Sequence, residues 1–214
     1  MSEAREQVLA RIRRSLADAS GAGGLAVPRG YRASLGLDRR GLVAHFEERV
    51  ADYDVTVRRS TPASLAADVT AVCAEIGVHR LGVPPDLPAA WRPDGVELVR
   101  DDGLSSSELD ALDGALTGCL LAIAETGTIV LDGGAAQGRR ALTLVPDLHL
   151  CIVRANEVVG TVPEAFELIG VERPVTFVSG PSATSDIELR RVRGVHGPRR
   201  LDVFVLGGGR PPQR

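Results

Sequence analysis

The stretch Ile123–Asp132, Ile-Ala-Glu-Thr-Gly-Thr-Ile-Val-Leu-Asp, places a polar turn between two runs of apolar residues. Those runs predict two short strand segments that meet at a tight turn, or one strand that bends there, and Gly127 supplies the backbone freedom that the bend needs. Glu125, Thr126 and Thr128 bring a carboxylate and two hydroxyls into chain that is expected to be buried. The stretch is therefore our first candidate both for the centre of the fold and for a ligand site.

Short apolar segments alternate with amphipathic ones along most of the chain. The apolar run 115–131 is expected to supply the central strands, and further strands are predicted at 55–58, 80–83, 96–99, 148–153, 175–178 and 203–206. Helices are predicted at 2–19, 38–52, 62–76, 105–112 and 161–169, and Thr161 and Glu164 have the spacing of a capping box. This alternation predicts an α/β fold with a mainly parallel sheet flanked by helices.

The first 24 residues are predicted to form an amphipathic helix followed by a glycine-rich linker. A helix this short needs a surface to pack against, and three alternatives are open: its own domain, a second copy of the chain, or a partner protein. Residues 25–206 are predicted to form the α/β domain, and residues 207–214 a flexible tail.

The composition is that of a soluble globular protein, with 44% hydrophobic and 25% charged residues. A net charge of −3 and an aromatic content of only 3% argue against nucleic acid as a partner. No apolar run approaches the roughly 20 residues of a membrane-spanning helix, and the start of the chain lacks the pattern of a secretory signal. We therefore expect a cytoplasmic protein that does not insert into membranes.

The three cysteines lie far apart in apolar contexts, which predicts buried, reduced thiols. No Cys-x-x-Cys motif is present, so the sequence predicts neither a zinc site nor an iron–sulfur cluster in this chain. No pair of histidines has metal-ligand spacing, and neither a Walker loop nor a Gly-x-Gly-x-x-Gly fingerprint occurs. We expect no metal and no cofactor.

A second polar cluster, Ser-Gly-Pro-Ser-Ala-Thr-Ser-Asp-Ile-Glu at 179–188, follows the strand predicted at 175–178. That strand is expected to be buried, and open α/β sheets bind ligands beyond the carboxyl ends of such strands. The cluster offers backbone that can approach a ligand, hydroxyl groups and a carboxylate, on Gly180, Ser182, Thr184 and Asp186. For Asp186, capping of a helix start is the alternative. We predict that this cluster and the Glu-Thr-Gly-Thr turn meet at one edge of the sheet and bind a small anion there.

Two loops and one strand end contribute further candidates. Residues 133–140, Gly-Gly-Ala-Ala-Gln-Gly-Arg-Arg, form a glycine-rich loop in which Arg139 or Arg140 can grip a carboxylate or phosphate. His196 lies in a glycine-bracketed turn just before the last strand, a position that favours function over a place in the core. His149, at the start of a strand, either orients a carboxylate or satisfies the strand end.

Four segments occur in an order that resembles a known family. They are Ala-Glu-Thr-Gly-Thr-Ile-Val-Leu at 124–131, Pro-Asp-Leu-His-Leu-Cys-Ile-Val at 146–153, Gly-Pro-Ser-Ala-Thr-Ser-Asp-Ile-Glu at 180–188 and Gly-Val-His-Gly-Pro at 194–198. In these segments the sequence resembles the lactate utilization protein C family (LutC, also called YkgG), which is built on the LUD domain. The resemblance covers the C-terminal half closely and the N-terminal half only in the layout of its elements.

This resemblance implies a fold similar to the NagB/RpiA/CoA transferase-like superfamily. It also implies an accessory, non-redox role in the oxidation of L-lactate to pyruvate, beside partner proteins that carry iron–sulfur clusters. Two alternatives stay open. One is an isomerase or an acyl/CoA transferase in which Glu125 is catalytic, as a nucleophile or a general base. The other is an assembly protein whose N-terminal helix docks the iron–sulfur partners.

Overall fold

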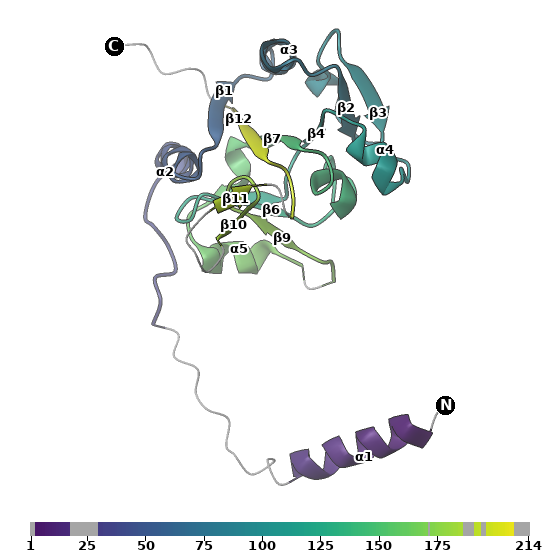
Figure 1. Cartoon of the computed structure of the whole chain (residues 1–214). Helices are drawn as coiled ribbons and strands as arrows, with labels where there is room; N and C mark the ends of the chain where they lie inside the picture. Colours follow the sequence, from purple (N-terminus) through teal and green to yellow (C-terminus); the bar gives the residue numbers. More distant parts are fainter. Residues whose placement is uncertain (1–2, 18–29, 171, 186–190, 194–195, 208–214) are drawn as a thin grey trace. The chain divides into compact units, whose positions relative to one another are not determined.

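The computed structural model describes residues 3–17, 30–170, 172–185, 191–193 and 196–207 (Figure 1). The chain divides into two compact units, residues 1–32 and residues 33–214. In the first unit, helix α1 (Glu3–Ala17) carries an apolar stripe whose side chains are exposed, Val8, Leu9, Ile12 and Leu16. The second unit contains all the other helices and strands that the structure describes.

The second unit is built on a six-stranded sheet in which every pairing is parallel. Its order is β1 (Thr56–Ser60), β12 (Arg200–Leu206), β7 (Leu148–Arg154), β4 (Gly114–Thr117), β2 (Arg80–Val83) and β3 (Glu97–Arg100). Strands β7 and β12 pair along their whole length, from Leu148 opposite Arg200 to Arg154 opposite Leu206. The predicted mainly parallel sheet is confirmed.

Helices cover both faces of this sheet. Alternate residues of a strand point to opposite faces, so the apolar strands present apolar side chains on both. Cys151 and Val153 of β7 belong to one core cluster, together with buried residues of α2 (Arg39–Ala51). Leu150 and Ile152 belong to another, together with buried residues of α3 (Leu65–Ile76). Shorter helices occupy the connections: α4 (Ser106–Asp110) and the 3₁₀ turns η2 (Ala89–Trp91), η3 (Arg140–Thr143) and η4 (Ala155–Glu157). Helices therefore flank both faces of the sheet, as predicted.

A second sheet has the order β8 (Val158–Val159), β5 (Leu121–Ile123), β6 (Thr128–Leu131) and β9 (Thr176–Val178). Strands β5 and β6 form an antiparallel hairpin, and β6 also pairs antiparallel with β9. The expectation that the whole run 115–131 supplies central strands of the parallel sheet is therefore wrong, since within this run only β4 belongs to that sheet. The physical reason is the turn at Gly127, because a tight turn joins antiparallel neighbours and cannot connect two parallel strands.

Strand β9 lies at the edge of the second sheet and is not the buried strand that its apolar sequence predicts. Its Phe177 is 45% exposed and lies against Phe166 of α5 (Val162–Leu168), with ring centroids 5.9 Å apart. The capping box predicted for Thr161 and Glu164 is present at the start of α5. An antiparallel pair of strands, β10 (Ala183–Ser185) and β11 (Arg191–Arg193), follows β9. Within the described ranges, no helix is both long and apolar enough to span a membrane.

Candidate anion-binding site

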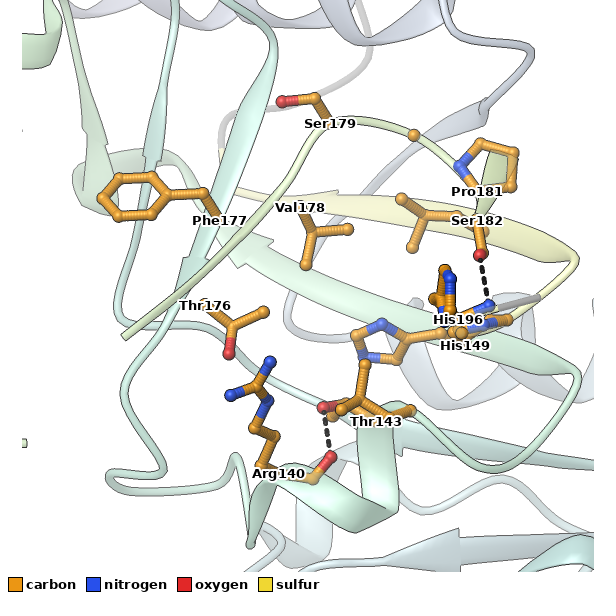
Figure 2. Close-up of a pocket in the computed structure, with 15 residues that line it drawn as sticks. Arg140, Thr143, His149, Thr176, Phe177, Val178, Ser179, Pro181, Ser182 and His196 are labelled. Carbon is orange, nitrogen blue, oxygen red and sulfur yellow. Dashed lines mark hydrogen bonds between the residues drawn. The ribbon is translucent and has the colours of Figure 1, made fainter. Parts of the chain in front are cut away.

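A cavity of about 270 Å³ lies between the parallel sheet and strand β9 (Figure 2). From the sheet it takes His149 and Leu201, which are opposite each other in the register of β7 and β12 and lie at the amino ends of these strands. The remaining walls come from η3, from β9 with the loop that follows it, and from the turn before β12; their polar side chains are Arg140, Thr143, Thr176, Ser179, Ser182 and His196. The cavity therefore lies at the amino edge of the parallel sheet, not beyond the carboxyl ends of its strands as the sequence argument expected.

The cavity has a cationic and hydroxyl-rich lining. Arg140 and two histidines face it, and no aspartate or glutamate is among the residues that line it in the described part of the chain. None of the described residues forms an ion pair or a side-chain hydrogen bond with the Arg140 guanidinium. Figure 2 shows the side chains of Arg140, Thr143 and His149 directed into the cavity. A second cavity of about 210 Å³ shares Arg140, Thr143 and Thr176 with the first, so this arginine is available to both. Such a lining favours a small anion.

His149 is buried, with only 2% of its surface exposed, and its Nε2 lies 2.8 Å from Oγ1 of Thr117. Burial lowers the pKa of His149 from its ordinary 6.5 to about 4, because the imidazolium would lose its hydration. The ring is therefore neutral at neutral pH and can act as a hydrogen-bonding group in the cavity wall. The sequence left the role of this histidine open between a strand-end contact and a functional one.

The loop after β9 is held in place by hydrogen bonds from backbone N–H groups. The N–H of Ser182 donates to the carbonyl of Pro198 over 2.8 Å, and the N–H of His196 donates to Oγ of Ser182 over 3.2 Å. Gly180 has φ +89°, and a Cβ at this position would lie 2.5 Å from Cβ of Tyr53. Gly180, Ser182 and His196, which the sequence singled out as ligand-binding, therefore line one cavity together.

The Glu-Thr-Gly-Thr turn touches this loop from outside the cavity. Oγ1 of Thr126 lies 2.7 Å from Oγ1 of Thr128, which lies 2.8 Å from Oγ of Ser179. The two polar clusters are thus joined, but Glu125, Thr126, Gly127 and Thr128 do not line either cavity described above. The backbone N–H of Glu125 donates to the carbonyl of Gly160 over 2.9 Å. The turn packs against the end of α2, since a Cβ on Gly127 (φ +62°) would lie 2.5 Å from the backbone of that helix.

Arg139, one of the two arginines that the sequence offered for gripping an anion, is occupied elsewhere. Its Nε lies 2.7 Å from Oδ2 of Asp101 and its Nη2 lies 2.8 Å from Oδ1, so the pair is bidentate. Burial of Asp101 opposes its ionisation, but the hydrogen bonds from Arg139 and from the N–H of Leu104 outweigh this and lower the pKa of the carboxyl group. The neighbouring residue, Arg140, faces the cavity instead. Sequence reasoning named both arginines and had no signal to choose between them.

Two other predicted residues are not placed in the site. Thr184 lies in β10, opposite Val192 of β11, and its side chain is outside the described part of the structure. Asp186 lies outside the described residues altogether. Sequence reasoning missed Thr143 and Thr176, because nothing in a 3₁₀ turn or an edge strand marks which hydroxyls face inward. Within the described ranges, no group of three or more His, Cys, Asp or Glu side chains is arranged to hold a metal ion.

Residues 102–206 match the LUD domain family, and this match includes every residue that lines the cavity. The chain is 44% identical over 212 residues to lactate utilization protein C of Deinococcus radiodurans, covering 96% of this chain and 97% of that protein. It is 30% identical over 191 residues to lactate utilization protein C 1 of Bacillus mycoides, covering 80% and 81%. The crystal structure of a DUF162 family protein from D. radiodurans is similar, with a TM-score of 0.70, 41% identity, and coverage of 80% of this chain and 99% of that one.

Fold and sequence thus define a LUD-domain protein with an α/β architecture. The chain belongs to the lactate utilization protein C (LutC, YkgG) family, as its motifs predicted.

Proposed function

We propose that the protein takes part in lactate utilization and that it binds a small organic anion in the cavity formed by Arg140, His149 and His196. The observation that carries the binding proposal is the lining itself: one arginine without a described partner, two histidines and several hydroxyls, with no carboxylate among them. A cavity lined in this way binds a carboxylate or phosphate better than a neutral molecule. The metabolic context comes from the names of the relatives, which are lactate utilization proteins.

We further propose that the role is accessory and non-redox, exercised in the cytoplasm beside iron–sulfur partner proteins, as the family resemblance implies. A second role, in assembly with those partners, is favoured by α1, because four of its apolar side chains are exposed at 37–60%. Catalysis by Glu125 has less support, because that carboxylate belongs to a turn that packs against α2 and does not line the cavity.

The proposal is tested by growth on L-lactate as the sole carbon source, using a strain that lacks this gene and is complemented with variants of it. Arg140→Gln should grow slowly, because a neutral amide removes the cation from the cavity without changing its walls. Arg92→Gln is the matched control, since Arg92 is exposed and lies outside the cavity, and it should grow like the wild type. Growth of the Arg140→Gln strain at the wild-type rate, with equal protein levels, would refute the role of the cavity. Deletion of residues 1–20 tests the assembly role separately.

A further inference from the structure

We infer that the cavity selects anions that carry a hydroxyl beside the charged group, and so favours 2-hydroxy acids over 2-oxo acids. In this proposal His149 accepts a hydrogen bond from that hydroxyl. The inference rests on the proposed function and adds a specificity to it. It depends on which groups in the cavity have a proton to donate and which can only accept one.

The contacts of Thr117 favour one tautomer of His149, because only in that tautomer are both hydrogen bonds of Thr117 made. The Thr117 hydroxyl has a single proton to donate. Its Oγ1 lies 2.9 Å from the carbonyl oxygen of Gly118, which can only accept. With its proton donated there, Oγ1 of Thr117 can only accept from Nε2 of His149, 2.8 Å away. In this arrangement Nε2 carries the ring proton. Thr117 acts as a positioning residue, since it orients His149 and does not line the cavity.

Nδ1 of His149 is consequently an unprotonated acceptor. Burial holds the pKa of the ring at about 4, so a second proton is absent at neutral pH. No described residue donates a hydrogen bond to Nδ1. Among the described residues, Nδ1 is also not one of the fully buried side-chain atoms that lack a hydrogen-bond partner, so it is accessible. Because His149 lines the cavity, the remaining lone pair is open to a ligand there.

Thr143 presents the same kind of group. Its hydroxyl donates to the carbonyl of Arg140 over 3.2 Å, so towards the cavity its oxygen can only accept. Arg140 is thus the cationic donor of the cavity, His149 and Thr143 are acceptors, and the hydroxyls of Ser182 and Thr176 can donate or accept. A ligand that satisfies Arg140, His149 and Thr143 together has an anionic group and a separate proton to donate. A 2-hydroxy acid such as lactate has both, whereas a 2-oxo acid such as pyruvate would bring a carbonyl lone pair against that of Nδ1.

The test is calorimetric titration of the full-length protein with L-lactate and with pyruvate at pH 7.5. The wild type should prefer L-lactate by about tenfold, the effect of one hydrogen bond gained against one acceptor left unpaired. His149→Gln keeps a polar group near Thr117 but loses Nδ1, and it should bind the two acids with equal affinity. Thr117→Val, which removes the constraint on the tautomer, should reduce the preference in the same direction.

A spectroscopic measurement keeps the test independent of whether either variant folds. Two-bond ¹H–¹⁵N correlation of the wild-type histidines should show His149 protonated at Nε2 and bare at Nδ1, and Thr117→Val should change this pattern. Binding of both acids with equal affinity, or a protonated Nδ1, would overturn the inference alone. If neither acid binds the wild type, the ligand is not a 2-hydroxy or 2-oxo acid and the inference fails, while the growth test with Arg140→Gln still decides the proposed function.

Discussion

The hydroxyl oxygens of Thr128 and Ser179 lie 2.8 Å apart and join two segments that are 51 residues apart in the chain. Thr128 opens strand β6 and Ser179 directly follows the antiparallel strand β9, so this contact closes the end of their pairing. Ser179 also lines the cavity, while Thr128 does not. The Glu-Thr-Gly-Thr turn therefore supports the wall of the candidate site from behind.

Replacement of Thr128 by valine should lower the free energy of unfolding by about 1 kcal/mol, because it leaves the hydroxyls of Thr126 and Ser179 without this partner while keeping the side-chain volume. The measurement is urea denaturation. Thr126→Val is the control, since Thr126 is at the open end of the same chain of hydroxyls and should cost less. Equal stability of Thr128→Val and the wild type would show that the contact does not stabilise the loop.

Gly180 should be the least replaceable glycine of the site loop. Alanine there would combine a strained φ of +89° with a Cβ 2.5 Å from Cβ of Tyr53, and should cost roughly 3 kcal/mol and weaken anion binding. Gly95 provides a matched control, because its φ is +72° but nothing lies within 4 Å of the added Cβ. Gly95→Ala should cost only about 1 kcal/mol. Equal losses for the two variants, measured by thermal and urea unfolding, would mean that the Tyr53 contact does not matter.

The Asp101–Arg139 pair should be worth more to stability than the exposed pair beside it. The side chain of Asp101 is fully buried and Arg139 binds both of its oxygens, so Asp101→Asn should cost about 2 kcal/mol. Asp102, 63% exposed and 3.4 Å from Arg100, gives the control, and Asp102→Asn should cost less than about 0.5 kcal/mol.

The same pair predicts a pH dependence of defined sign. The folded pKa of Asp101 is lowered, so its contribution is fully present above the unfolded pKa of about 3.9 and is lost as the pH falls through the lower folded value. Below pH 4 the wild type should therefore lose stability more steeply than Asp101→Asn. Parallel curves for the two proteins would contradict this.

The lowered pKa of His149 predicts a loss of stability that begins at a higher pH than the loss due to Asp101. Its folded pKa of about 4 is below its ordinary 6.5. Above pH 6.5 the ring is therefore neutral in the folded and unfolded states, and its titration does not change stability. As the pH falls from about 6.5 towards 4, only the unfolded chain takes up the proton, and stability should fall by up to roughly 3 kcal/mol. Subtracting the curve for His149→Gln isolates this loss, because the other histidines are shared. A difference that does not change with pH would contradict a buried, neutral His149.

The sequence was sufficient for the main sheet and insufficient for the second one. Strand 80–83 and the capping box of Thr161 and Glu164 follow from local patterns, and local chemistry determines both. The apolar run 115–131 looks uniform, yet it is divided between two sheets, and hydropathy carries no information on which sheet a buried strand joins.

The site could be predicted only in part for a similar reason. Gly180, Ser182 and His196, which line the cavity, could be predicted because they lie in turns next to strand ends. Arg139 and Arg140 are adjacent and chemically identical, and only the tertiary position of Asp101 determines which of them is free. Glu125 was the most conspicuous candidate, but whether a turn faces a cavity or a neighbouring helix depends on packing that a single sequence does not encode locally.

The central claim, that the cavity beside Arg140 is an anion site, is tested most directly by calorimetric titration of L-lactate into the wild type, Arg140→Gln and Arg92→Gln. We expect saturable binding to the wild type, unchanged affinity for Arg92→Gln, and an affinity at least about tenfold lower for Arg140→Gln, because a charge-assisted contact is lost. Binding that is equally tight in Arg140→Gln, or no binding to the wild type, would contradict the account.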